Sequence, residues 1–154
     1  MKQSPEMQRI QETMTFGSLA AHGFLGHDTR NLTDIIRDDT LAVERLGLTH
    51  SAIADRMEYF TELASKRLGE SVEIDGIYRV VCEEHKGKLP CPFADNVRVA
   101  KSMTTVINAE NHLSMRWSAL NVHMIRAHGF YEGLGARFRV DPKLTAKALG
   151  LKTS

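Results

Sequence analysis

The spacing of apolar residues changes twice along this chain, and this change limits the possible folds more than any other feature. From about residue 5 to 69, apolar side chains recur every three or four positions, which is typical of amphipathic helices. From about 71 to 118 they alternate, as in strands, and from about 119 to 150 the helical spacing returns. We therefore predict an α+β fold, with N-terminal helices, a central antiparallel β-hairpin sheet and C-terminal helices packed on one face.

Local signals divide the first part into three helices. Ser4–Glu6 combines an N-cap, a proline at the first helical position and an acid in the first turn. We expect this helix to end at Ala21–Phe24, where a glycine can take the left-handed conformation. The apolar spacing predicts a second helix over about 30–46 and a third over about 49–68, and a glycine follows each of them.

The alternating part predicts two hairpins. A short strand at 72–74 is followed by the turn Asp75–Gly76 and a second strand that begins at Tyr78. Residues 97–107 and 113–117 form the second hairpin, around a polar turn.

Between these hairpins the chain is expected to leave the sheet. Residues 85–88 include Gly87 and predict another turn, and Pro90 and Pro92 cannot donate to a strand ladder. Residues 89–96 should therefore be a loop or a sheet edge. After the second hairpin we expect a helix over 120–128 and a last helix that begins at Asp141–Pro142.

Length and charge narrow the class of protein. The 154 residues suit one domain, and 20 basic against 19 acidic residues give a net charge of +1. Such a balance provides no overall attraction to nucleic acid or anionic lipid. The polar N-terminus and the absence of a run of about 18 apolar residues predict a cytoplasmic protein without a membrane span. Two cysteines in such a chain are expected to be reduced.

A set of thiols and imidazoles in the second half forms a candidate zinc site. Its members are Cys82, His85, Cys91, His123 and His128. Zinc accepts tetrahedral sulfur and nitrogen donors, and four of these five residues would suffice. Four protein ligands would make the metal structural, whereas three ligands and a water would permit hydrolysis.

The spacing of the same residues also fits a simpler interpretation. Cys82 and Cys91 are farther apart than a usual zinc-binding pair. His123 and His128 differ by roughly 140° around an ideal helix, so both can face one ion only if the last turn is distorted. A cysteine buried in the core and a histidine near a helix C-terminus are common structural features, and we give this interpretation more weight.

A second candidate lies at Leu41–Met57, which resembles the helix-turn-helix of bacterial repressors over about seventeen residues. Gly47 occupies the turn, but Val43 stands where that pattern has a small residue. Acids outnumber arginines among the side chains that the second helix would present: His50, Ser51, Asp55, Arg56, Glu58 and Tyr59. DNA binding is therefore the second hypothesis, and nucleic acid is not the expected partner.

The remaining sequence indicates no known catalytic class. Nucleotide-binding loops and nucleophile elbows are missing. His128, Glu132 and Arg137 surround a glycine-rich loop that suits a small acid–base site, although glycines there more often supply turns. A third hypothesis is a small-molecule or protein interaction domain that forms homo-oligomers through exposed surfaces.

One resemblance covers much of the second half of the chain. The run Lys88–Phe93 and the pattern from Trp117 through His123 and His128 to Gly133 are similar to a group of small bacterial proteins described as predicted cytosolic proteins. The resemblance implies a cytosolic location and no particular activity.

Overall fold

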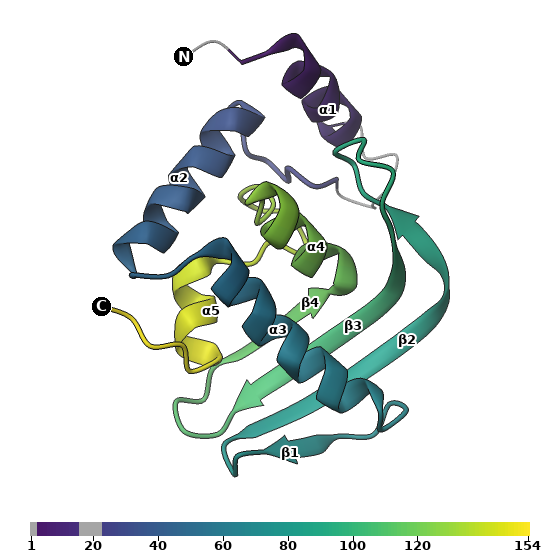
Figure 1. Ribbon diagram of the computed structural model, residues 1–154, viewed down its shortest axis with the longest axis vertical. Coiled ribbons are helices and arrows are strands. Elements are labelled where there is room, and N and C mark those ends of the chain that lie inside the picture. Colours follow the sequence, from purple (N-terminus) through teal and green to yellow (C-terminus); the bar gives the residue numbers. More distant parts are fainter. Residues whose placement is uncertain (1–2, 16–22) are drawn as a thin grey trace.

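The computed structural model describes residues 3–15 and 23–154, and it confirms the α+β fold (Figure 1). The elements in chain order are α1 (Pro5–Thr15), α2 (Leu32–Arg45), α3 (His50–Ser65), β1 (Val72–Ile74), β2 (Tyr78–Pro90), β3 (Arg98–Asn108), β4 (Ser114–Ser118), α4 (Ala119–His128) and α5 (Pro142–Ala148). The expected end of the first helix lies partly outside the described residues. Within the described parts of the chain, none of these helices has the length and apolar character to cross a bilayer.

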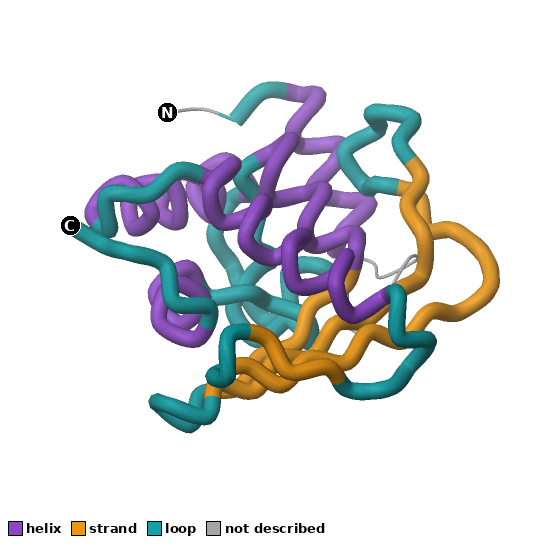
Figure 2. Tube along the Cα trace, turned by 60° about the horizontal axis from the view of Figure 1, so that its bottom comes forward, coloured by secondary structure: helices purple, strands orange, loops and turns teal. Residues whose placement is uncertain are grey.

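The strands form one antiparallel sheet in the order β1-β2-β3-β4. Figure 2 shows this sheet along one side of the molecule, with the helices over one of its two faces. Both hairpins predicted from the alternating pattern are present. Asp75 and Gly76 take positive φ angles of 55° and 67° in the three-residue connection between Ile74 and Tyr78, where the Ile77 N–H donates to the Ile74 carbonyl and closes the turn.

The prediction of a turn at 85–88 is wrong. β2 continues through these residues to Pro90, and the pairing with β3 shifts between His85 and Lys88, so that Lys86 and Gly87 form a bulge. Gly87 takes a φ of 98°, which explains why glycine stands there. Leu89 and Pro90 end β2 at an edge of the sheet, because β1 pairs only with Tyr78–Val80, and residues 91–96 form a loop, as predicted.

The inner face of β3 is more polar than an alternating strand usually is. Its buried residues are Ser102, Thr104, Val106 and Asn108, whereas Ile107 points outward and is 46% exposed. Thr104 is hydrogen-bonded to Thr61 of α3, and the Trp117 indole donates to the same Thr61 hydroxyl at 3.0 Å. These bonds satisfy the buried Thr104 hydroxyl and the Trp117 indole N–H, and they connect the sheet to α3.

The buried side chains form two separate clusters. The sheet core lies between the sheet, α3, α4 and α5, and its largest members include Ile53, Met57, Phe60, Trp117, Ile125, Tyr131 and Leu149. The loop core lies between α1, α2, α4 and the loop after β2, and consists of Ile10, Met14, Phe24, Leu25, Leu32, Ile35, Cys91, Phe93, Leu120, Met124 and Phe130. Helix α4 contributes to both and therefore joins them.

Side-chain caps set the starts of α3, α4 and α5. Thr49 accepts a hydrogen bond from the Ala52 N–H, and Asp141 accepts one from the Leu144 N–H. Ser118 and Asn121 form a reciprocal capping box that begins α4 directly after β4. The first residue of α4 is fixed in this way relative to the sheet.

Leu68 provides a test of backbone strain far from any candidate site. It has a φ of 49° and its side chain is 93% exposed, so little packing offsets an unfavourable left-handed backbone. We expect Leu68→Gly to raise the free energy of unfolding by about 1 kcal/mol, measured by urea denaturation. Leu68→Ala keeps the strain and should give no such gain, and an equal gain in both variants would contradict this account.

Candidate metal centre

The loop from Cys91 to Val97 places the first two donors of the site. The Cys91 N–H donates to the Val97 carbonyl at 2.9 Å, and the Val97 N–H donates to Asp95 Oδ1 at 3.0 Å. Ala94 and Asn96 have φ angles of 58° and 62°, so the residues on both sides of Asp95 are left-handed. Such conformations persist where surrounding contacts impose them, and here they direct the Asp95 carboxylate toward α4.

Helix α4 supplies the two imidazoles. His123 lies in its middle and His128 is its last residue, after which Gly129 takes a left-handed φ of 63°. The distortion expected in the last turn is not needed: helical geometry runs through His128, and the Gly129 N–H donates to the Ile125 carbonyl as in a regular helix. The two rings meet edge to face, with centroids 5.5 Å apart.

Four donor atoms converge at one place. Nε2 of His123 and Nε2 of His128 each lie 2.8 Å from Asp95 Oδ2, and the Cys91 Sγ lies 3.6 Å from the His128 Nε2. One donor atom from each of the four residues lies within 4.8 Å of every other. A tetrahedral zinc with bonds of about 2.0 to 2.3 Å sets its donors roughly 3.3 to 3.8 Å apart. Small side-chain shifts would therefore bring all four onto one ion.

The pKa values of the two acids in this group, Cys91 and Asp95, are shifted in opposite directions. Burial raises the pKa of the Cys91 thiol to about 12, and the neighbouring Asp95 carboxylate contributes to the same shift. Burial also opposes ionisation of Asp95, but hydrogen bonds from His128, from the Val97 backbone and from His123 hold its pKa well below the ordinary value.

Aromatic packing fixes the orientation of His128. The Phe93 ring stacks on the imidazole at 4.1 Å with an interplanar angle of 10°, and Phe130 packs edge-on against Phe93. Phe93 lies on the same loop as Cys91 and Asp95, so a single stack holds the loop against α4. Phe93 and Phe130 both belong to the loop core.

Three of the five residues in the predicted site come together, and a fourth donor was missed. Cys91, His123 and His128 belong to the cluster, and Asp95 completes it. Proximity along the loop to Cys91 was the only sequence signal for Asp95, and a lone acid in a loop is too common to be diagnostic.

Cys82 and His85 lie away from this cluster. Cys82 is buried in the sheet core, opposite Thr104 of β3, and His85 is exposed on the long strand β2. The physical reason is the length of β2: eight residues lie between Cys82 and Cys91, and the pairing of Cys82 with Thr104 and of Pro90 with Arg98 sets these two points of the strand roughly 20 Å apart. Both cysteines are free thiols, as expected.

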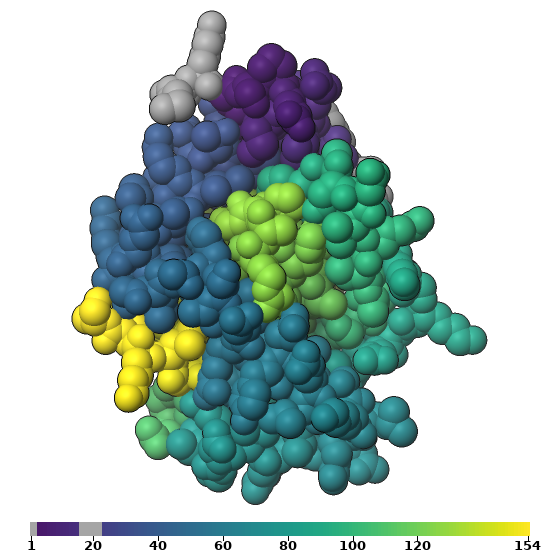
Figure 3. All heavy atoms as spheres, viewed as in Figure 1, coloured from purple at the N-terminus to yellow at the C-terminus, as the bar shows by residue number. Residues whose placement is uncertain are grey.

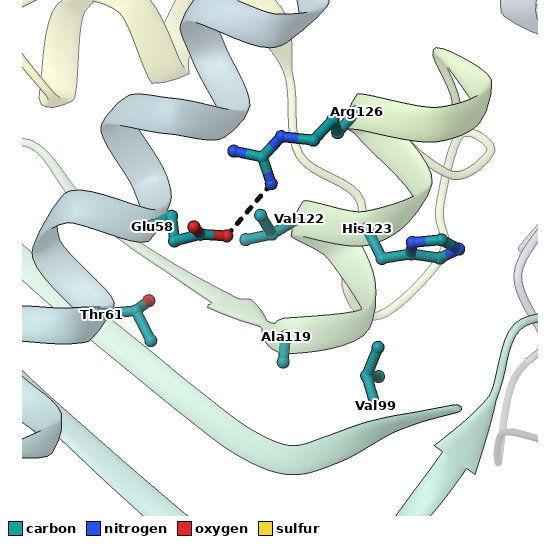
Figure 4. A pocket seen from close by; sticks show the side chains of 7 residues that line it. All are labelled: Glu58, Thr61, Val99, Ala119, Val122, His123 and Arg126. Atoms are coloured by element: carbon teal, nitrogen blue, oxygen red, sulfur yellow. Dashed lines mark hydrogen bonds and ion pairs between the residues drawn. The ribbon is translucent and has the colours of Figure 1, made fainter. Parts of the chain in front are cut away.

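A shallow pocket borders the centre on the far side of His123. It measures about 280 Å³ and is lined by Glu58, Thr61, Val99, Ala119, Val122, His123 and Arg126. Figure 4 shows Glu58 on α3 facing Arg126 on α4, and the two side chains form an ion pair at 3.0 Å. The Arg126 guanidinium also pairs with Asp55 at 2.6 Å, so much of its hydrogen-bonding capacity is already used.

The helix-turn-helix-like segment offers little to a phosphate backbone. Helices α2 and α3 follow the predicted turn at Gly47, but His50 is hydrogen-bonded to Tyr131 and Thr40. Arg56 donates to the Leu149 carbonyl and lies over the Phe60 ring. The exposed side chains of α3 are Ser51, Asp55, Tyr59 and Glu62. This face is acidic rather than basic.

A second set of polar side chains is buried beside the glycine-rich loop, and His128 is not part of it. Arg139 binds the Asp39 carboxylate through two hydrogen bonds of 2.9 Å and donates to the Glu132 carbonyl at 2.6 Å. The Glu132 side chain accepts a hydrogen bond from the Asn121 amide at 2.8 Å, and this residue is only 3% exposed. Burial raises the pKa of Glu132 to about 8, although the Asn121 bond and the charge of Arg139 oppose the shift.

Comparisons of the chain with protein-family models, with curated proteins and with solved structures gave no match. The case for a function therefore depends on the geometry of the site. That geometry is a cluster of Cys91, Asp95, His123 and His128 whose donor atoms lie close enough together to hold a metal ion.

Proposed function

We propose that this protein binds zinc through Cys91, Asp95, His123 and His128, and that the ion has a structural role. The observation that carries the proposal is the convergence of four donor atoms, from a loop and a helix, within 4.8 Å of one another. The loop backbone is strained on both sides of Asp95, which supports a conformation selected for the position of that carboxylate.

A metal site explains the geometry better than a catalytic cysteine does. In a cysteine–histidine–aspartate relay, the thiol and the carboxylate contact opposite nitrogens of the imidazole. Here the Cys91 Sγ and the Asp95 Oδ2 both approach Nε2 of His128. All the donors therefore face one point in space, as ligands of a metal do.

The donor set favours zinc among the common metals. One thiolate, two imidazoles and one carboxylate match the sulfur, nitrogen and oxygen ligands of tetrahedral zinc, whereas magnesium and calcium prefer oxygen alone. Four protein donors fill a tetrahedral shell, which is typical of a structural site. This is the reason for proposing a structural ion before a hydrolytic one.

Elemental analysis of untagged protein, purified without chelators, tests this proposal. We expect about one zinc ion per chain in the natural protein and a nearly complete loss in Cys91→Ser, because serine removes the thiolate ligand. Cys82→Ala is the matched control: it removes the other thiol, which lies in the sheet core, and should retain the metal. Zinc-free protein after reconstitution with zinc chloride, or equal loss in both variants, would overturn the proposal.

A further inference from the structure

Helix α1 packs on the loop that carries two of the metal ligands. Ile10 and Met14, its buried residues, share the loop core with Cys91 and Phe93. A hollow between the helix and the loop is lined by Glu6, Arg9, Ile10, Thr13, Pro92 and Ala94. Figure 3 shows α1 at one end of the molecule, next to α2 and to the segment after β2.

This helix depends on its neighbours for stability. It has eleven residues, and isolated helices of that length are marginal in water. Its other connections to the described chain include a hydrogen bond at the start of α2, where Gln11 accepts from the Leu32 N–H at 2.8 Å. Gln3, which precedes the helix, accepts from the Thr33 N–H at the same distance. The burial of Met14, which is fully inaccessible, should contribute most to its docking.

The surface that receives α1 is itself held by the metal ligands. Cys91 and Asp95 lie at the start and in the middle of the loop, and the left-handed backbone around Asp95 needs outside contacts to persist. An ion bound to both residues and to α4 would fix the loop at two points. The packing of α1 against this loop would then be made on a rigid surface.

We propose that zinc binding at this centre and docking of α1 on the Cys91–Val97 loop are coupled, so that the ion controls whether the N-terminal helix is packed. This inference rests on the proposed zinc site. Coupling of this kind is reciprocal, and docking of α1 must therefore strengthen zinc binding by the same factor.

Hydrogen exchange of the natural protein tests the first half of this coupling. We expect backbone amides of α1 to exchange at least about tenfold faster after zinc is removed by a chelator, and to recover when zinc chloride is added. Amides of α3, which packs in the sheet core, serve as the internal reference and should change much less. Equal α1 exchange with and without bound zinc would overturn the inference while leaving the zinc site intact.

Two methionine variants test the reciprocal half. Met14 in the loop core and Met57 in the sheet core are both fully buried, and neither is a ligand. We expect Met14→Ala to weaken zinc affinity about tenfold, and folded Met57→Ala to bind zinc within about twofold of the natural protein. Equal affinities in the two variants would overturn the coupling, and failure of the natural protein to bind zinc would overturn both proposals.

Discussion

Saturation of the centre with zinc should raise the free energy of unfolding by about 4 kcal/mol when the free metal is a thousandfold above its dissociation constant. The reason is that the donors meet only in the folded chain: Cys91 and Asp95 follow β2, whereas His123 and His128 lie on α4, beyond the second hairpin. For a chain of this length, the gain corresponds to a rise in Tm of about 10 °C. Differential scanning calorimetry of zinc-free and zinc-loaded protein measures it directly.

The matched variant for this measurement is Asp95→Asn. Asparagine keeps the size of the side chain and can still accept a hydrogen bond, but it has no negative charge for the ion. We expect less than half of the stabilisation to remain in it, and magnesium to stabilise neither protein because the site offers thiolate and imidazole donors. An unchanged zinc effect in both Asp95→Asn and Cys91→Ser would show that the ion binds elsewhere.

The sequence predicts the element order well because each signal acts locally. Helix caps such as Thr49 and Asp141, and the Asp75–Gly76 turn, depend on residues only a few positions apart. The change of apolar period is likewise a property of neighbouring residues. The tertiary structure keeps these local features unchanged, so the predictions that depend on them hold in the folded chain.

The errors come from contacts that a local pattern does not contain. Gly87 suggests a turn, but pairing with β3 on both sides of the bulge keeps β2 continuous. On β3, the polar residues Thr104 and Asn108 can occupy the inner face because partners on α3 and at the end of α5 satisfy them.

For the metal centre too, the sequence predicts what depends on residue type and misses what depends on contacts between distant segments. Residue type pointed to Cys91, His123 and His128, because thiols and imidazoles are rare and chemically distinctive. Residue type also pointed to Cys82 and His85, which the extension of β2 places far from the others. Asp95 becomes a candidate only when the loop brings its carboxylate to α4, and no spacing rule along the chain encodes that approach.

Glu132→Gln should change how stability depends on pH, with the largest effect above neutral pH. The Glu132 carboxyl is buried, its backbone has a φ of 70°, and the side-chain bond it receives comes from the Asn121 amide. Arg139 contacts its backbone carbonyl and directs its charge to Asp39. A neutral glutamine can keep the Asn121 contact, and it removes the need to bury a charge.

The direction of this pH dependence follows from the raised pKa of Glu132, which is about 8 in the folded protein against an ordinary value near 4.5. Between these values the folded state binds the extra proton, so the contribution of Glu132 to stability is complete below about pH 4.5 and is lost as the pH rises to about 8. The loss is on the order of 5 kcal/mol. Urea denaturation of both proteins from pH 5 to 9 should therefore show that the free energy of unfolding of Glu132→Gln increases relative to that of the natural protein as the pH rises. A constant difference across this range would mean that Glu132 ionises near its ordinary pKa, and that the buried group around Arg139 accommodates the charge.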